Sequence, residues 1–433
     1  MKKVILAGVF VILALIMLRD NATAQDENQN DGRTFGLSRM DLVIPDEIWS
    51  DIRARVGYEG RPLGYSADEM GHFKNSKCIL RNVEMLFRDI TSVPQFSGRF
   101  GDEVLADPSN FALTTFAAYR TLDAYAARVL DYPLPDGWGV NWLEDNASFD
   151  EVLETVAVTP GHTRPGSVYN WNILPNEIKT LMLRVVVAAI EAKPWLLEAF
   201  DHDFLKAYFE TDDIGDITMQ QLYEFASAPW QDNDGQPVPR QSFEALDKFD
   251  MRYFATGSNY FLRQVHAAIR EYQLAIEESN PDYTDFNYYE FHTELGRVAI
   301  FGDGSDTIIG DESLEYFLIV DLGGDDIYTG QTAVPLSLEK PFGIVIDLGG
   351  NDTYDSGDES AALACGNHGI GAIFDLEGDD VYTCHESGIA CAWFGTGLVV
   401  DYSGDDRYES HIWSQGAAHA GVGALIDLSG DDY

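Results

Sequence analysis

The stretch Asp321-Leu-Gly-Gly-Asp-Asp-Ile-Tyr328 decides the fold of the last third of this chain, because four further copies follow it. The copies begin at Asp347, Asp375, Asp401 and Asp427, at intervals of 26, 28, 26 and 26 residues. Each has an apolar segment before a leading aspartate, then a small-residue turn and two acidic or amide residues, and the first four add a tyrosine. A fixed period of this length is typical of stacked repeats, because one unit is too small to bury its own apolar face.

The apolar segments have the alternation of a strand. Residues one and three before the leading aspartate, and the residue after it, are almost all apolar, as in Ile344, Ile346 and Leu348, which indicates a face turned inward. The residue two before the aspartate is apolar too, so we expect the outer face to be covered by another solenoid wall or by the preceding domain. A coil of about 26 residues fits a parallel β-helix better than a propeller blade, which needs about 40. The tyrosines should then stack.

Residues 41–296 have a different pattern, in which apolar residues recur at the three- and four-residue steps of helices. We expect helices at 109–130, 149–158, 176–192, 218–228 and 258–276. The predicted fold class is α+β multidomain: an N-terminal all-α helical domain over 41–296, then a C-terminal parallel β-helix (solenoid) over 297–433. The fifth copy stops without a polar capping segment, so we expect the sequence to be part of a longer chain.

The first 24 residues have the pattern of an export signal. Lys2 and Lys3 precede an apolar run over residues 4–18, and Ala22-Thr23-Ala24 resembles a cleavage site. A run of about 15 residues is short of the ~20 that span a bilayer, which favours a cleaved signal over a retained anchor. Residues 25–40 are then a flexible linker. We predict a bacterial protein that is secreted, periplasmic or on the cell surface, with no stable membrane span after cleavage.

The charge of the chain bears on its partners. The net charge is −44, and the sequence has no stripe of basic residues that could contact phosphates. Both features argue against nucleic acid as a partner. Residues 300–433 hold 26 acidic residues and two basic ones. A surface suited to saline surroundings would explain a general excess of acid, but not why these acids fall on repeat positions. The acidic positions therefore indicate a specific role, with divalent cations as the expected partners.

Stacked coils would line up three rows of carboxylates about 4.8 Å apart. Unit charges at that spacing repel by about 1 kcal/mol in water and by about 3.5 kcal/mol at an effective dielectric of 20. Calcium would compensate, because it accepts about six to eight oxygen ligands in flexible geometry. Alternatively, each aspartate caps its own turn by accepting backbone N–H bonds, without an ion. The candidate ligands are Asp303, Asp306, Asp321, Asp325, Asp326, Asp347, Asp352, Asp375, Asp379, Asp380, Asp401, Asp405, Asp406, Asp427, Asp431 and Asp432.

Two short segments resemble a known repeat. Gly302-Asp-Gly-Ser-Asp-Thr-Ile-Ile-Gly310 resembles the haemolysin-type (RTX) calcium repeat, and Gly349-Gly-Asn-Asp-Thr-Tyr354 is similar to its variants. The resemblance implies a parallel β-roll with calcium between Gly/Asp turns. It departs from that family because nonapeptides do not follow in tandem. By matching positions it implies ion ligation by Asp303, Asp306, Asp352 and the equivalent Asp326, Asp380, Asp406 and Asp432.

Cysteine and histidine also recur at repeat positions. Cys365 and Cys391 each lie ten residues before a leading aspartate, so we predict that they are neighbours, either bonded or as two free buried thiols. His385 and His411 each lie ten residues after one and should stack. They are the catalytic candidates, although stacked histidines also occur as a polar edge or an adventitious metal site.

These patterns favour a non-enzymatic function. We expect an exported, calcium-binding β-solenoid whose surface binds or adheres to extracellular polysaccharide or to a surface protein. One rival is a carbohydrate-active enzyme, a polysaccharide lyase or hydrolase, because such acid–base chemistry pairs groups of different pKa. The other rival places catalysis in the helical domain, where the sequence offers no residues to name.

Overall fold

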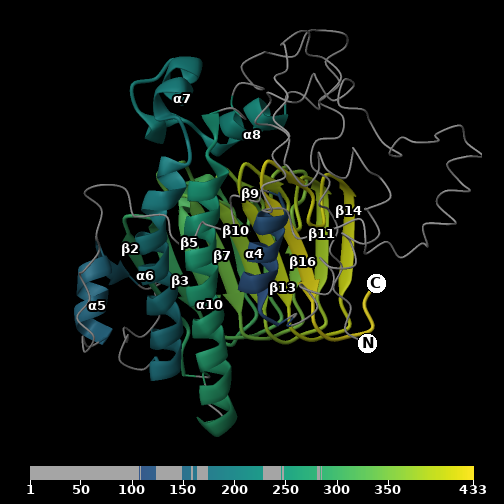
Figure 1. Ribbon diagram of the computed structural model, residues 1–433. Helices are drawn as coiled ribbons and strands as arrows, with labels where there is room; N and C mark the ends of the chain where they lie inside the picture. The colour runs from purple at the N-terminus through teal and green to yellow at the C-terminus, as the bar shows by residue number, and fades with distance from the viewer. Residues whose placement is uncertain are drawn as a thin grey trace, which may run out of the picture.

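The computed structural model describes residues 107, 109–122, 149–157, 159–162, 174–227, 245, 248–279, 283 and 285–433. In these ranges a parallel β-solenoid forms the C-terminal part, and α-helices lie against one of its faces (Figure 1). The helices are α4 (Phe111–Leu122), α5 (Phe149–Val156), α6 (Asn176–Glu198), α7 (His202–Phe209), α8 (Met219–Ser227) and α10 (Met251–Ser279). The predicted signal peptide and linker, residues 1–40, lie outside the described residues.

Helices form in each of the five segments where the sequence predicts them, but their ends differ. α6 continues past residue 192 to Glu198, and α10 begins at Met251 instead of residue 258. Gly257 therefore lies inside α10, where a Cβ would be 3.0 Å from the side chains of Leu196 and Trp195. The glycine permits the close approach of α6 and α10. The all-α character of residues 41–296 as a whole stays a prediction, because much of that range lies outside the described residues.

The solenoid has three parallel walls, formed by an eight-, a five- and a three-stranded sheet. The eight-stranded sheet contains β1 (Thr159–His162), β2 (Tyr288–Thr293), β3 (Gly296–Phe301), β5 (Tyr316–Asp321), β7 (Phe342–Asp347), β10 (Ile370–Asp375), β13 (Thr396–Asp401) and β16 (Val422–Asp427). The five-stranded sheet contains β4 (Thr307–Gly310), β6 (Ile327–Gly330), β8 (Thr353–Asp355), β11 (Val381–Glu386) and β14 (Arg407–Ile412). The three-stranded sheet contains β9 (Gly366–Asn367), β12 (Ala392–Trp393) and β15 (Ala418–His419).

Successive coils stack in register, as the repeat predicts. Asp375 pairs with Asp347 on one side and with Asp401 on the other, and Tyr382 pairs with Tyr354 and Tyr408. The rings of Tyr328, Tyr354, Tyr382 and Tyr408 stack at centroid distances of 4.6, 4.6 and 5.0 Å. The parallel β-helix with coils of about 26 residues is therefore confirmed.

An additional coil precedes the five recognised from the sequence. Phe301 pairs with Asp321, and Ile308 pairs with Tyr328, so they occupy the positions of the leading aspartate and the tyrosine. The segment that resembles the RTX repeat, from Gly302 onward, is thus the turn of this additional coil. Its apolar residues end the aspartate row and the tyrosine stack on this side.

The faces of the eight-stranded sheet are the reverse of the predicted ones. Val345, two residues before Asp347, packs inside the solenoid with the stacked tyrosines. Ile344 and Ile346 belong instead to the core that the sheet shares with the helices. Side chains alternate between faces along a strand, so Asp347 shares the face of Val345 and points into the solenoid.

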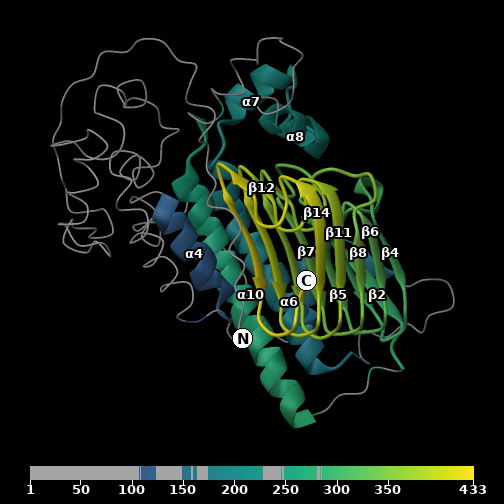
Figure 2. The same ribbon diagram turned by 90° about the vertical axis from the view of Figure 1, so that its right-hand side faces the viewer.

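Helices cover the face of Ile344 and Ile346, which the sequence analysis predicted to lie inside, while the face of Val345, predicted to be the covered outer face, packs within the solenoid. α4, α6 and α10 lie across the eight-stranded sheet, and the five-stranded sheet lies on the side away from them (Figure 2). The ring of Phe111 in α4 is 4.8 Å from that of Phe374 in β10, and Phe261 in α10 is 4.9 Å from Phe342 in β7. The Tyr119 hydroxyl also forms a buried 2.6 Å hydrogen bond with Thr396 Oγ1.

Strand pairing begins before residue 297, inside the segment that the sequence analysis assigned to the helical domain. β2 pairs antiparallel with β3, and β1 pairs antiparallel with β2. The aromatic residues of β2, Tyr288, Tyr289 and Phe291, are buried in this sheet. Among the described helices, none combines the length and the apolar character needed to cross a membrane.

Replacement of Phe374 by alanine tests the contact between the helices and the sheet. Phe374 is 0% exposed, so Phe374→Ala should lower the free energy of unfolding by about 3–5 kcal/mol. Leu113→Ala is the control, because Leu113 in α4 is 51% exposed and its loss should change stability by less than about 0.5 kcal/mol. Urea unfolding followed by circular dichroism measures both. Equal effects would contradict the packing of α4 on β10.

Candidate metal centre

Two rows of aspartates lie inside the solenoid. The leading row, Asp321, Asp347, Asp375, Asp401 and Asp427, ends the strands of the eight-stranded sheet, and each member is at most 2% exposed. The second row is Asp326, Asp352, Asp380, Asp406 and Asp432, five residues further along each coil. The turn between the rows is tight: Gly378 has φ of +153°, and a Cβ there would be 1.6 Å from the Gly350 carbonyl oxygen. Glycine lets the turn bring the second aspartate back toward the first.

Each second-row aspartate is tied to its neighbouring coil by one carboxylate oxygen. Asp352 Oδ1 accepts the backbone N–H of Asp326 at 2.6 Å, and Asp380 Oδ1 accepts that of Asp352 at 2.6 Å. Asp406 and Asp432 repeat the contact at 2.8 and 3.3 Å, and Asp326 receives the N–H of Asp306. The prediction that each aspartate caps its own turn is therefore wrong for this row, because the capped N–H belongs to the preceding coil. It is correct in the leading row for Asp321 and Asp347, whose Oδ1 atoms accept the N–H groups two residues further on at 3.2 and 3.0 Å.

Leading aspartates receive the tyrosine hydroxyls. Tyr328 donates to Asp347 Oδ2 at 2.5 Å, Tyr354 to Asp375 Oδ2 at 2.7 Å and Tyr382 to Asp401 Oδ2 at 3.0 Å. Each tyrosine therefore contacts the leading aspartate of the following coil. Burial raises the pKa of these tyrosines well above its ordinary value, so they stay protonated and donate.

Several buried carboxylate oxygens receive no such donor. Among the described residues they are Oδ2 of Asp326, Asp352, Asp380 and Asp406, and Oδ1 of Asp375 and Asp401. A buried polar atom without a partner is costly, and a carboxylate is more costly than a neutral group. These oxygens are the observation that points to a cation, and the groups of possible ligands that contain them consist, among the described residues, of aspartates alone.

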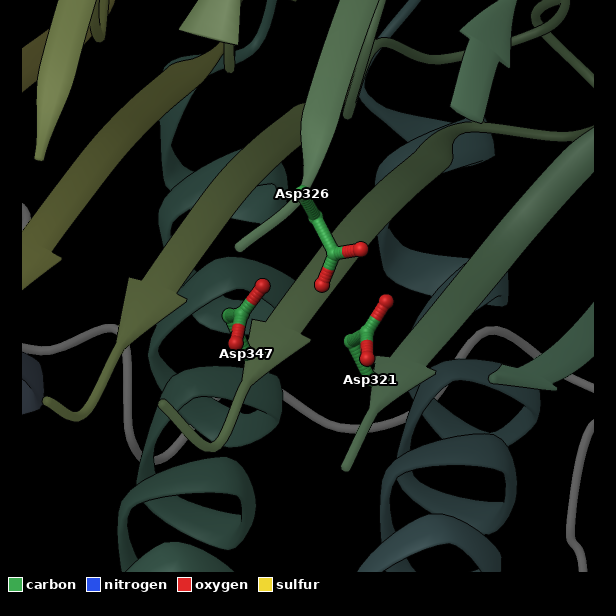
Figure 3. A group of neighbouring side chains, drawn as sticks. All are labelled: Asp321, Asp326 and Asp347. Carbon is green, nitrogen blue, oxygen red and sulfur yellow. The ribbon is translucent and has the colours of Figure 1, made fainter. Parts of the chain in front are cut away.

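The two rows form four groups whose ligand oxygens lie within 4.8 Å of one another. The first group is Asp321, Asp326 and Asp347 (Figure 3); the second is Asp347, Asp352 and Asp375; the third is Asp380, Asp401 and Asp406; and the fourth is Asp406, Asp427 and Asp432. In Figure 3 the three carboxylates of the first group point toward one another, two from the ends of the neighbouring strands β5 and β7 and the third, Asp326, from just before β6. All-oxygen sites of this kind suit calcium, magnesium or manganese better than softer metals.

Burial raises the pKa of every described carboxyl group in these rows for which a shift is resolved. The pKa rises to about 6 for Asp352 and Asp406, to about 7 for Asp326 and Asp427, and to about 8 for Asp380. Neighbouring carboxylates raise it further, and the pKa of Asp401 reaches about 10. The pKa values of Asp321, Asp347 and Asp375 are also well above the ordinary value. The rows must therefore bind either protons or cations to remain buried.

Ten of the sixteen predicted ligands belong to these groups, and six do not. Asp303 is exposed and Asp306 is half-buried in the additional coil. Asp325, Asp379, Asp405 and Asp431 are exposed and form a third row with Asn351, in which Oδ1 accepts the N–H of the next coil at 2.8–3.0 Å. Asn351 fits this row because only an acceptor oxygen is needed.

The histidine and cysteine pairs lie elsewhere. His385 and His411 stack at 5.1 Å between ring centroids on the exposed face of the five-stranded sheet, far along the coil from the aspartate rows. Their catalytic role stays a prediction. Cys365 and Cys391 are neighbours as predicted, with the N–H of Gly366 donating to the Cys391 carbonyl at 2.8 Å, and both thiols are free and buried.

Sequence reasoning missed the tyrosine hydroxyls as partners of the carboxylates. The signal was present, because each tyrosine follows its leading aspartate by seven residues. Comparison of the chain with protein-family models, with curated proteins and with solved structures finds no match to any of them. The RTX resemblance therefore has no support from a family match, and the geometry of the rows carries the interpretation.

The raised pKa values predict how stability depends on pH when metal is removed. A group with a raised pKa contributes full stability below its unfolded pKa of about 3.9 and loses it as pH rises through the folded value. In chelator, the melting temperature should therefore fall between pH 5 and pH 9, through the range set by Asp352, Asp406, Asp326 and Asp380. Thermal scans in EDTA or EGTA measure this. A melting temperature that rises over that interval would contradict the buried carboxylates.

Proposed function

We propose that this chain is an exported calcium-binding β-solenoid protein that serves a binding or adhesion role outside the cell or at its surface. One observation carries the calcium proposal: buried aspartates converge in groups and keep oxygens that no donor among the described residues reaches. A cation among them would replace the missing donors and remove the repulsion between coils. Asp321, Asp347, Asp375, Asp401 and Asp427 would hold the cations together with the second row.

Calcium fits this donor set better than magnesium. The ligands come from different coils of a stacked sheet, so their positions are set by the strand spacing and not by an octahedron around a small ion. Calcium tolerates irregular oxygen geometry, whereas magnesium demands a near-ideal octahedron and keeps several waters. Binding would neutralise carboxylates that otherwise hold protons. Calcium would thus act as a structural cation that stabilises the stack of coils.

The binding role is supported by the exposed outer face of the five-stranded sheet. Its outward side chains include Ile309 and Ile327, which are 53% and 45% exposed, together with several threonines, Val381 and, on β14, the charged Arg407 and Glu409. A flat sheet with exposed apolar side chains suits contact with a polysaccharide or a protein surface. The export proposal depends on the N-terminal sequence pattern alone.

Calcium should raise the melting temperature of the protein. At a calcium concentration of about 100 times the Kd, the gain in the free energy of unfolding is about 2.7 kcal/mol. Asp401→Asn should reduce this gain because it alters a buried ligand, while Asp405→Asn, in the exposed third row, should leave it unchanged. Terbium provides a second readout, because the stacked tyrosines would sensitise its luminescence. Unchanged melting and no sensitised emission would remove the calcium proposal.

Retention on a target tests the binding surface. The double variant Ile309→Lys with Ile327→Lys should reduce retention of the protein on insoluble cell-wall polysaccharide or on intact bacterial cells, because it places charge on the exposed apolar face. Leu113→Lys with Leu274→Lys is the control, since it adds the same two charges at similarly exposed apolar positions on α4 and α10. A pull-down in calcium compares the three proteins. Equal retention of all three would exclude this face as the binding surface.

A further inference from the structure

The four aspartate groups are not equivalent, because they contain different numbers of leading aspartates. The first and second groups each contain two leading aspartates and one second-row aspartate. The third and fourth groups each contain one leading aspartate and two second-row aspartates. In the part of the solenoid that the structure describes, tyrosine hydroxyls reach the leading aspartates and not the second row, so the third and fourth groups receive fewer tyrosine donors.

The third group has the most buried oxygens that receive no hydrogen bond from the described residues. Each of its three carboxylates keeps one oxygen that receives no hydrogen bond: Asp380 Oδ2, Asp401 Oδ1 and Asp406 Oδ2. These residues are 1%, 0% and 2% exposed, so water does not replace the missing donors from outside. The second group has two such oxygens, on Asp352 and Asp375, and the first has one, on Asp326.

The shortest tyrosine contact is also shorter in the first two groups, which have fewer unpaired oxygens, than in the third. Asp347, shared by the first two groups, receives the Tyr328 hydroxyl at 2.5 Å and the Gly349 N–H at 3.0 Å. Asp401 in the third group receives the Tyr382 hydroxyl at 3.0 Å. The shorter contacts stabilise the anionic form of Asp347 more strongly than that of Asp401. A cation would therefore add less stabilisation at the first two groups than at the third.

We propose that Asp380, Asp401 and Asp406 form the primary calcium site of the solenoid, which fills at calcium concentrations that leave the first and second groups empty. This inference rests on the proposed function and specifies the order in which its sites load. A buried carboxylate oxygen gains most from a cation where no N–H or O–H group already stabilises it. The competing occupant is a proton shared between Asp401 and Asp406, whose carboxyl groups are close enough for a hydrogen bond when one is protonated.

The primary site would join two successive coils, because Asp401 and Asp406 both belong to the coil that follows that of Asp380. Asp380 follows β10, Asp401 ends β13, and Asp406 lies in the turn that leads to β14. Asp406 Oδ1 already accepts the N–H of Asp380 at 2.8 Å, so the two second-row ligands are held in register before the ion binds. Preorganised ligands cost less to order, which adds to the affinity of the third group.

A matched pair of substitutions tests this order. Asp380→Asn and Asp352→Asn change equivalent residues: both are 1% exposed, both accept a neighbouring N–H through Oδ1, and both leave Oδ2 without a donor. Calcium titration of the full chain by isothermal calorimetry, repeated as competition against terbium luminescence, measures the tightest binding phase. Asp380→Asn should weaken that phase by about tenfold or more, and Asp352→Asn should change it by less than about threefold.

The outcomes separate the two proposals. If the wild-type protein binds neither calcium nor terbium saturably, the proposed function fails and this inference fails with it. If it binds calcium but both variants lose the tightest phase equally, or Asp352→Asn loses more, only the inference is overturned. Should Asp380→Asn not fold, Asp401→Asn and its control Asp375→Asn repeat the comparison in the leading row, where both residues receive a tyrosine hydroxyl and keep Oδ1 free.

Discussion

The burial of carboxylates inside a stack of parallel coils is the constraint on which the rest of the structure depends. Because side chains alternate along a strand, Asp347 lies on the same face as Val345, which packs inside the solenoid. The side chain of Asp347 is therefore buried. Stacking in register then places a second carboxylate in each neighbouring coil. The structure meets part of the cost with hydrogen bonds, which reach both oxygens of Asp321 and Asp347. Among the described residues, one oxygen is left to a proton or a cation in Asp326, Asp352, Asp375, Asp380, Asp401 and Asp406. The stability of the solenoid is therefore linked to the composition of the solution around it.

The tyrosine stack on the opposite wall fills the interior and supplies donors to the buried carboxylates. Its rings fill the interior with apolar area at a spacing of 4.6–5.0 Å, and its hydroxyls reach the leading aspartates across the solenoid. A phenylalanine stack would fill the same volume but leave Asp347 and Asp375 without these donors. The two faces of the eight-stranded sheet thus have separate tasks. The inner face carries the leading aspartates and faces the tyrosines, and the outer face, covered by α4, α6 and α10, contributes the larger apolar core.

The repeat period was enough to predict the solenoid, the register, the aspartate rows and the tyrosine stack, because each follows from like residues at a fixed interval. It was not enough to predict which face of the sheet lies inside. Ile344 and Val345 lie on opposite faces of the strand and are both apolar. The sequence pattern therefore does not distinguish the face that lies inside the solenoid from the face that lies outside it. The additional coil could not be recognised from the sequence, because it has Phe301 and Ile308 where the other coils have the leading aspartate and the tyrosine. The third acidic row looked equivalent to the other two, and only side-chain direction shows that it faces solvent.

The irregular interval in the repeat shows which part of the coil is constrained. The distance in sequence from Asp347 to Asp375 is 28 residues instead of 26, yet Asp380 Oδ1 accepts the N–H of Asp352 at the same 2.6 Å that joins Asp352 to Asp326. The leading and second aspartates remain five residues apart in every coil. The segment that follows β8 includes Gly357, which has a positive φ of 58° and open space around it, and can accommodate extra residues without disturbing the rows. The length of a coil can therefore vary, but the five-residue spacing between its leading and second aspartates cannot. This constancy is what keeps the aspartates of successive coils in register.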